Sequence, residues 1–269
     1  MAGRTKKKQG KQAKDTGENK LAYWLAWAAG GILVVAAVVG MLLAARSSSK
    51  QATGAPPSPS SSPRALVCEN ASPPELGMRI LRSEPYPMTI DPEASYEAEV
   101  TTSCGTMLIR LFPERAPIAV NNFVHLAKDD FYRGQIFHRI DRSLGVIQAG
   151  DPGCPTSVDT CGTGGPGYTI RHEWPNGLRP HVGTVAMASA GLPNSSGSQF
   201  EIIAGKSKYK LPRERTIFGE LVGRHSFQVA SLILSIPTKV SPRAPANSAA
   251  NYPDGEFVYI TNITIIKKG

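Results

Sequence analysis

The sequence lacks the residue patterns that most metal and cofactor sites require. Its four cysteines include no Cys-x-x-Cys pair, and its five histidines show no metal-ligand spacing. It has no Gly-x-Ser-x-Gly nucleophile elbow. One Gly-x-Gly-x-x-Gly match at 162–167 contains a proline and precedes β-type residues instead of a helix. These absences argue against a zinc site, a serine hydrolase and a dinucleotide-binding protein.

Charge of either sign is missing from residues 21–45. At 1.5 Å per residue this run can cross a hydrocarbon core of ~30 Å, and aromatic residues lie near its start. The basic segment before it, residues 1–20, indicates a cytoplasmic N-terminus. We therefore expect a single-pass anchor in the cell membrane with the remainder extracytoplasmic. The alternative is a cleaved signal peptide.

Large apolar side chains are missing from residues 46–65, which are rich in serine and proline and predict a linker. Residues 66–269 then have the composition of a globular domain. The net charge of +9 lies mostly before this domain, because residues 1–20 contribute +5 and residues 46–65 contribute +3. The domain is therefore nearly neutral, which argues against nucleic acid as a partner.

Four cysteines allow three disulfide pairings. Cys154 and Cys161 flank a short segment that a disulfide would close, and this leaves Cys68 for Cys104. The second disulfide would attach the start of the domain to its first hairpin. Zinc is the weaker alternative.

Short β-type runs dominate the domain. Residues 96–103 and 107–112 predict a hairpin, and residues 257–266 predict a closing strand. Further β-type runs lie at 136–140, 146–148, 182–188, 200–203 and 216–222. Helices are expected only after Pro113 and over 226–236. Many short strands with two helices favour a closed or nearly closed β-barrel capped by helices.

Three segments together resemble the cyclophilin family of peptidyl-prolyl isomerases. They are Phe-His-Arg-Ile at 137–140 with 146–151, Gly-Thr-Gly-Gly at 162–165, and 185–190 with Gly-Ser-Gln-Phe at 197–200; Ile-Phe-Gly at 217–219 adds a smaller match. The resemblance spans about 95–266. It implies a mainly β fold, a closed eight-stranded antiparallel barrel with two capping helices. It also implies no metal, no organic cofactor, and proline-containing peptides or unfolded exported proteins as partners.

The resemblance assigns roles to residues of this sequence. Arg139 matches the arginine that hydrogen-bonds the prolyl nitrogen while the amide twists, and Gln148 matches a residue that orients it. Both are expected to be catalytic. The expected peptide-binding residues are His138, Val146, Gly162, Ala188, Ser189, Gln199, Glu201, Leu211 and Arg215. The enzyme reading is an isomerase that assists folding of exported proteins.

The proline pocket of the family is altered in this sequence. Val146, Glu201 and Arg215 stand where methionine, phenylalanine and histidine are common, and the first pocket aromatic maps to Leu144 or Gly145. A more polar pocket predicts reduced activity. Glu201 is expected to pair with Arg139, where it would compete with catalysis, or with Arg215. A tethered, non-catalytic peptide-binding module is the alternative function.

The connection between Gly150 and Gly162 is longer than in common family members. This insertion, which the Cys154–Cys161 disulfide would close, either shapes substrate choice or is a stabilised surface loop.

Overall fold

The computed structural model describes residues 68, 74–77, 81–154, 161–206, 211–212, 215–240, 251–253 and 257–268. All of them belong to one compact unit, Ser62–Gly269. The predicted tail, membrane anchor and linker (1–20, 21–45 and 46–65) lie outside the described residues. Within the described part of the chain, no helix is both long and apolar enough to cross a bilayer.

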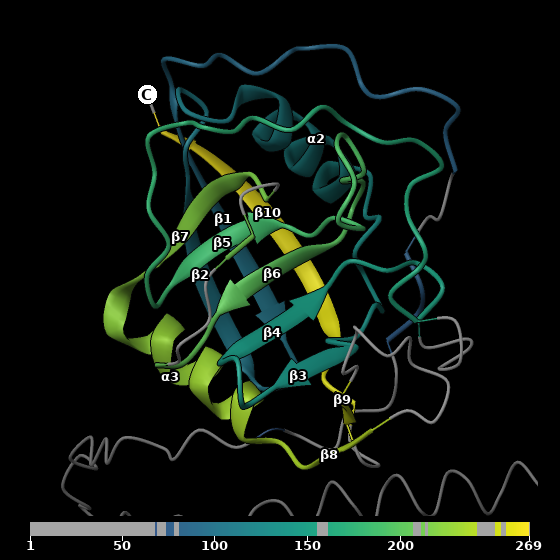
Figure 1. Ribbon diagram of the computed structural model, residues 1–269, viewed down its shortest axis with the longest axis vertical. Coiled ribbons are helices and arrows are strands. Elements are labelled where there is room, and N and C mark those ends of the chain that lie inside the picture. Colours follow the sequence, from purple (N-terminus) through teal and green to yellow (C-terminus); the bar gives the residue numbers. More distant parts are fainter. Residues whose placement is uncertain are drawn as a thin grey trace, which may run out of the picture. The chain divides into compact units, whose positions relative to one another are not determined.

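Eight antiparallel strands form one curled sheet in the order β10-β1-β2-β7-β5-β6-β4-β3 (Figure 1). The strands are β1 (Ser95–Thr102), β2 (Gly105–Leu111), β3 (Arg139–Asp141), β4 (Val146–Ala149), β5 (Thr184–Met187), β6 (Phe200–Ile203), β7 (Ile217–Val222) and β10 (Ile260–Lys268). A separate hairpin pairs β8 (Thr238–Val240) with β9 (Asn251–Pro253), and the sequence did not predict it. The mainly β class and the eight antiparallel strands are confirmed.

The sheet is a half-barrel whose edge strands, β3 and β10, form no continuous ladder with each other. Local backbone hydrogen bonds cross the gap instead. Gly134 N–H donates to the Ile260 carbonyl (2.8 Å), and Ile260 N–H donates to the Gln135 carbonyl (2.8 Å). Because β3 has only three residues, the chain just before it makes these contacts. The expected closed barrel is therefore confirmed only as a curled half-barrel.

Two helices, α2 (Pro117–Lys128) and α3 (Gly223–Ser235), pack at opposite ends of the curled sheet (Figure 1). Both were predicted. Proline suits the first turn of α2 because that turn needs no N–H donor there. The carboxylate of Glu173 accepts hydrogen bonds from the Ile118 and Ala119 N–H groups (2.9 Å each), so a distant residue caps α2.

The core centres on an aromatic cluster inside the curled sheet. The ring of Phe123 on α2 lies 5.3 Å from Tyr132, 5.6 Å from Phe200 and 5.3 Å from Phe218, between ring centres. All four side chains are buried. The hydrophobic face of α2 is thereby joined to β6 and β7 in one packed unit.

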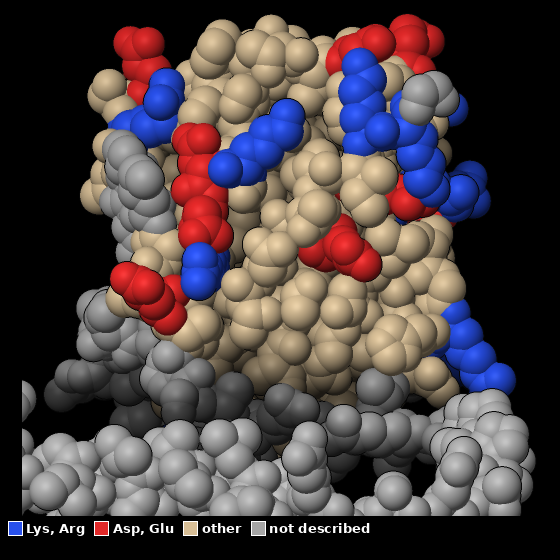
Figure 2. Space-filling model, turned by 180° about the vertical axis from the view of Figure 1, so that it is seen from behind, with Lys and Arg blue, Asp and Glu red and all other residues tan. Residues whose placement is uncertain are grey.

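The surface of the domain mixes charges of both signs. On the face shown in Figure 2, lysine and arginine side chains alternate with aspartate and glutamate, and no field of one sign extends across it. This agrees with the near-neutral charge of residues 66–269.

Both predicted disulfides are confirmed. Cys68 pairs with Cys104 beside the β1–β2 turn, and Cys154 pairs with Cys161. Cys154 and Cys161 pack with Ile136 and Tyr259 in a small buried cluster. The insertion after Gly150 is therefore anchored at its base to the segments that cross the gap between β3 and β10.

Phe123→Ala should lower the free energy of unfolding by about 3–5 kcal/mol, because it removes the central ring of a fully packed cluster. Urea unfolding followed by fluorescence measures this change. Phe227→Ala on α3 is the matched control, since that side chain is 36% exposed. The control should cost less than about 1 kcal/mol. Equal losses for the two variants would contradict the assigned core.

Candidate active site

Three predicted site residues lie in one row across neighbouring strands. Arg139 on β3 pairs with Gln148 on β4, and Gln148 pairs with Glu201 on β6. Directly opposed residues share a face of the sheet, with Cβ atoms about 4.5–5.5 Å apart. The alternate residues Ile140, Ile147 and Ile202 belong to the core, so the row lies on the outer face of the curled sheet.

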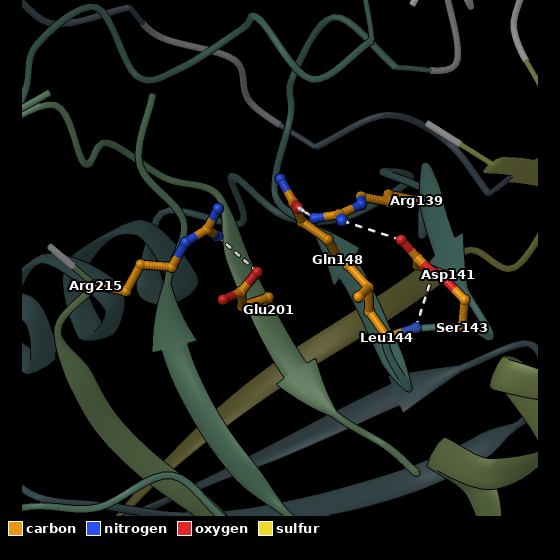
Figure 3. Close-up of polar contacts among 7 residues, drawn as sticks. All are labelled: Arg139, Asp141, Ser143, Leu144, Gln148, Glu201 and Arg215. Atoms are coloured by element: carbon orange, nitrogen blue, oxygen red, sulfur yellow. Dashed lines mark hydrogen bonds and ion pairs between the residues drawn. The ribbon is translucent and has the colours of Figure 1, made fainter. Parts of the chain in front are cut away.

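Arg139 is held by two side chains (Figure 3). Its Nη1 donates to Gln148 Oε1 (3.3 Å) and its Nη2 donates to Asp141 Oδ2 (3.2 Å). The Arg139 side chain is 16% exposed. Its Nε has no hydrogen-bond partner among the described residues. The guanidinium is thus fixed through both terminal nitrogens, while one N–H group is left without a partner in that part of the chain.

Gln148 connects Arg139 to a second glutamine. Its Nε2 donates to Gln199 Oε1 (2.9 Å), and Gln199 Nε2 donates to the carbonyl of Gly164 (2.7 Å). Each amide can satisfy these contacts in only one orientation. This geometry supports the predicted role of Gln148 in orienting the arginine.

A groove of about 360 Å³ adjoins the two glutamines. It is lined by Gln148, Gly162, Thr163, Gly164, Gly165, Tyr168, Thr169, Ala188, Ser189, Ala190, Ser195, Gly197 and Gln199. Four residues that the sequence predicted for peptide contact therefore meet along one groove with Gln148, which it predicted to be catalytic: Gly162, Ala188, Ser189 and Gln199. Its size suits a segment of extended peptide.

Asp151 holds the glycine-rich wall of this groove in place, and sequence reasoning missed it. The carboxylate is fully buried and accepts hydrogen bonds from the N–H groups of Gly153 (2.7 Å), Gly162 (2.6 Å) and Gly164 (2.9 Å). A Cβ at position 164 would lie 2.1 Å from Asp151 Oδ1, so glycine is required there. The carboxylate thereby fixes the insertion at both ends.

His138 lies beneath the groove wall and does not line it. The side chain is 2% exposed, and a Cβ at position 162 would lie 3.9 Å from its Nε2. Burial lowers the pKa of His138 to about 4, and Arg139 adds to this effect while Asp151 opposes it. The imidazole is therefore neutral at pH 7, and its expected peptide contact stays a prediction.

Glu201 pairs with Arg215 and not with Arg139. Arg215 Nη1 lies 2.6 Å from Glu201 Oε2, and the Glu201 side chain is fully buried (Figure 3). The sequence allowed Glu201 to pair with Arg139 or with Arg215, and the structure has the pair with Arg215. Arg139 is therefore bonded to Gln148 and Asp141 instead. Val146 is buried and Leu211 is half-buried; neither lines the 360 Å³ groove. Their predicted peptide contacts are not tested by this geometry.

The curled antiparallel sheet, the two helices and the arginine–glutamine row agree with the resemblance to cyclophilins that the sequence motifs indicated. The sequence model of the family "Cyclophilin type peptidyl-prolyl cis-trans isomerase/CLD" matches residues 98–249. The chain therefore belongs to the cyclophilin-type peptidyl-prolyl cis-trans isomerase family.

Several relatives are similar to this chain. Peptidyl-prolyl cis-trans isomerase A of Mycobacterium tuberculosis is 36% identical over 174 residues, covering 58% of this chain and 90% of the relative. Probable peptidyl-prolyl cis-trans isomerase B of the same species is 34% identical over 185 residues, covering 62% of this chain. The chain spans only 57% of isomerase B, about half of that relative's length.

A solved structure has the same fold. The cyclophilin type peptidyl-prolyl cis-trans isomerase of Cryptosporidium parvum aligns with a TM-score of 0.52 and 27% identity. The alignment covers 65% of this chain and 99% of the other. A second structure of that protein was determined in the presence of the dipeptide Ala-Pro.

The depressed pKa of His138 predicts a pH dependence of stability. The unfolded chain, with a histidine pKa near 6.5, binds a proton that the folded domain excludes until the pH falls to about 4. The contribution of His138 is therefore complete above about pH 6.5 and is lost as the pH falls toward 4. Between pH 7 and pH 5, wild type should lose about 2 kcal/mol more unfolding free energy than His138→Gln.

Urea unfolding at a series of pH values measures this difference. His225→Gln is the matched control, because His225 is exposed on α3. The control should follow the wild-type pH profile. Parallel profiles for wild type and His138→Gln would contradict the assignment of His138 as a buried neutral imidazole.

Proposed function

We propose that this domain catalyses cis–trans isomerisation of X-Pro bonds in peptides, with Arg139 as the catalytic residue. The single observation that carries the proposal is the position of its guanidinium. It is fixed by Gln148 on the outer face of the sheet, and Gln148 itself lines the peptide-sized groove. Membership of the isomerase family and the names of the relatives support the same reaction.

The reaction needs no bond to break, which agrees with a site built from an arginine and two glutamines. Partial double-bond character gives the peptide bond a rotation barrier of ~18–20 kcal/mol. When the amide twists, the lone pair of the prolyl nitrogen localises and becomes a hydrogen-bond acceptor. A guanidinium N–H directed at that nitrogen binds the twisted state more strongly than either planar isomer, and this difference is catalysis.

Magnitudes show that Arg139 cannot act alone. An acceleration of ~10⁵-fold requires about 7 kcal/mol of differential stabilisation. One hydrogen bond from a charged donor contributes roughly 1.5–3 kcal/mol. The remainder must come from fixing the peptide in the groove, orienting its carbonyl and removing water. In this proposal Gln148 and Gln199 orient the arginine and the peptide, and Ala188 and Ser189 lie along the peptide backbone.

The pocket beside Arg139 accounts for the expected reduction in activity. Glu201 and Arg215 stand where the resemblance has phenylalanine and histidine, and they form an ion pair. A proline ring would gain less from this surface than from aromatic rings, at roughly 25 cal/mol per Å² of apolar area. We therefore propose slower isomerisation than in members that retain an aromatic pocket.

The proposed substrates are exported proteins, and the proposed location is the outer side of the cell membrane. The uncharged residues 21–45, the basic residues before them and the serine- and proline-rich linker at 46–65 support this location. The two disulfides are consistent with an oxidising compartment. A linker of 20 residues would let the domain reach chains roughly 25 Å from its anchor.

A non-catalytic peptide-binding module is the second candidate, and two ion pairs favour it. Glu201–Arg215 makes the pocket polar, and Asp141 already occupies one nitrogen of Arg139. A domain that only binds proline-containing peptides would need the groove but not a free guanidinium donor. Activity, not binding, therefore separates the two candidates.

Arg139→Ala should abolish the acceleration of prolyl isomerisation while leaving the fold intact. The measurement is the slow refolding phase of a proline-limited substrate protein, with residues 62–269 and their disulfides intact. Arg133→Ala is the matched control, because Arg133 is exposed and pairs only with Asp130 among the described residues. Wild type and Arg133→Ala should accelerate the phase equally.

If neither wild type nor Arg139→Ala accelerates the slow refolding phase while both still bind peptide, the result would support the binding module instead. Full activity of Arg139→Ala would contradict the catalytic role of that residue.

A further inference from the structure

Among the described residues, Asp141 is the one partner of Arg139 that neither the sequence motifs nor the resemblance assigned. It stands two residues after Arg139 in the three-residue strand β3, so both side chains lie on the outer face of the sheet. The Asp141 side chain is only 2% exposed. A carboxylate removed from water in this way is costly unless it is paired and hydrogen-bonded.

The two oxygens of Asp141 have different partners. Oδ2 accepts from Arg139 Nη2 (3.2 Å). Oδ1 accepts from the Ser143 hydroxyl (2.7 Å) and from the Leu144 N–H (3.0 Å), both in the turn between β3 and β4 (Figure 3). One carboxylate thereby connects the guanidinium to the turn between β3 and β4.

Two partners fix the guanidinium more strictly than one. With Gln148 on β4 as its only partner, the arginine could rotate about that bond, whereas Asp141 on β3 holds the second terminal nitrogen. An arginine side chain loses rotamer entropy when it is fixed, and this loss is complete before the reaction when its planar group is held at two points. Donors fixed before the reaction need no reorganisation as the amide twists.

The geometry points to Asp141 as a positioning residue for Arg139 in the isomerisation proposed above, on which this inference rests. The carboxylate holds the Nη2 side of the guanidinium and Gln148 holds the Nη1 side, so the terminal N–H groups that these two bonds do not use can face a peptide. Asp141 does not touch the reacting atoms. It acts through Arg139, so its removal lowers the rate of the chemical step and leaves binding of the peptide in the groove nearly unchanged.

Asp141→Asn tests this role while retaining the turn. The amide oxygen can still accept from Ser143 and Leu144, but the amide N–H₂ then faces Arg139 Nη2, and two donors do not bond. We expect kcat to fall roughly tenfold, with KM changed less than twofold. Exchange NMR on an Ala-Pro tetrapeptide gives both values. Asp141→Thr, which suits a strand, should show the same loss and serves if the asparagine variant does not fold.

Ser143→Ala is the matched control. It removes a contact to the same carboxylate and spares the bond to Arg139, so kcat should change less than twofold. If Asp141 only stabilised the turn, Asp141→Asn, which keeps both turn contacts, would lose no more activity than Ser143→Ala. That result would overturn the inference.

A second readout does not depend on activity. In wild type, the Arg139 side-chain N–H signals should be resolved in a ¹H–¹⁵N spectrum because rotation of the guanidinium is restricted. In Asp141→Asn the guanidinium should rotate more freely, so the separate N–H signals should merge into an average. In Ser143→Ala they should remain resolved. Signals that stay resolved in Asp141→Asn would overturn the positioning role, whether the domain is an isomerase or a binding module. Signals that average in Asp141→Asn, in a domain whose wild type has no activity, would contradict only the proposed reaction.

Discussion

The register of β3, β4 and β6 is the constraint on which the site depends. It places Arg139, Gln148 and Glu201 side by side on the outer face, while the residues between them fill the core. Because side chains alternate with a period of two, a slip of one residue in a strand would turn its polar residue of this row toward the core and its isoleucine to the outer face. The packing that stabilises the barrel therefore also aligns the guanidinium with the glutamine that orients it.

Polar contacts then extend from this row in two directions. On one side, Gln148 and Gln199 lead to the glycine-rich wall, which Asp151 holds through three backbone N–H groups. On the other side, Glu201 and Arg215 form an ion pair in which the Glu201 side chain is fully buried. Buried ion pairs cost desolvation that their attraction offsets only with good geometry. The site thus keeps a fixed donor for the reaction but offers proline a less apolar surface.

Much of the fold could be predicted because its signals are local. Alternation over 96–103, the apolar spacing of α2 and the closeness of Cys154 to Cys161 all depend on neighbouring residues. Arg139, Gln148 and Gln199 were found through the resemblance, which carried information that the residues alone did not. Glu201 was foreseen as a partner of Arg215 or Arg139, and only the tertiary fold decides between residues on different strands.

The missed residues are those whose partners depend on loop geometry. Asp151 binds N–H groups 2, 11 and 13 residues away, and no sequence spacing shows that these converge. Asp141 had a visible signal, since residues two apart on a strand share a face, but its bond to the Leu144 N–H depends on the shape of the turn. Closure of the barrel was overestimated because β3 is too short to form a ladder with β10.

A crystal structure of the domain with an Ala-Pro peptide bound tests the central claim most directly. The distance that matters joins the Arg139 guanidinium to the prolyl nitrogen of the peptide. The account predicts a separation within hydrogen-bond reach, about 3 Å, with Arg139 still bonded to Gln148. A peptide seated in the groove with Arg139 turned away from the prolyl amide would contradict the account.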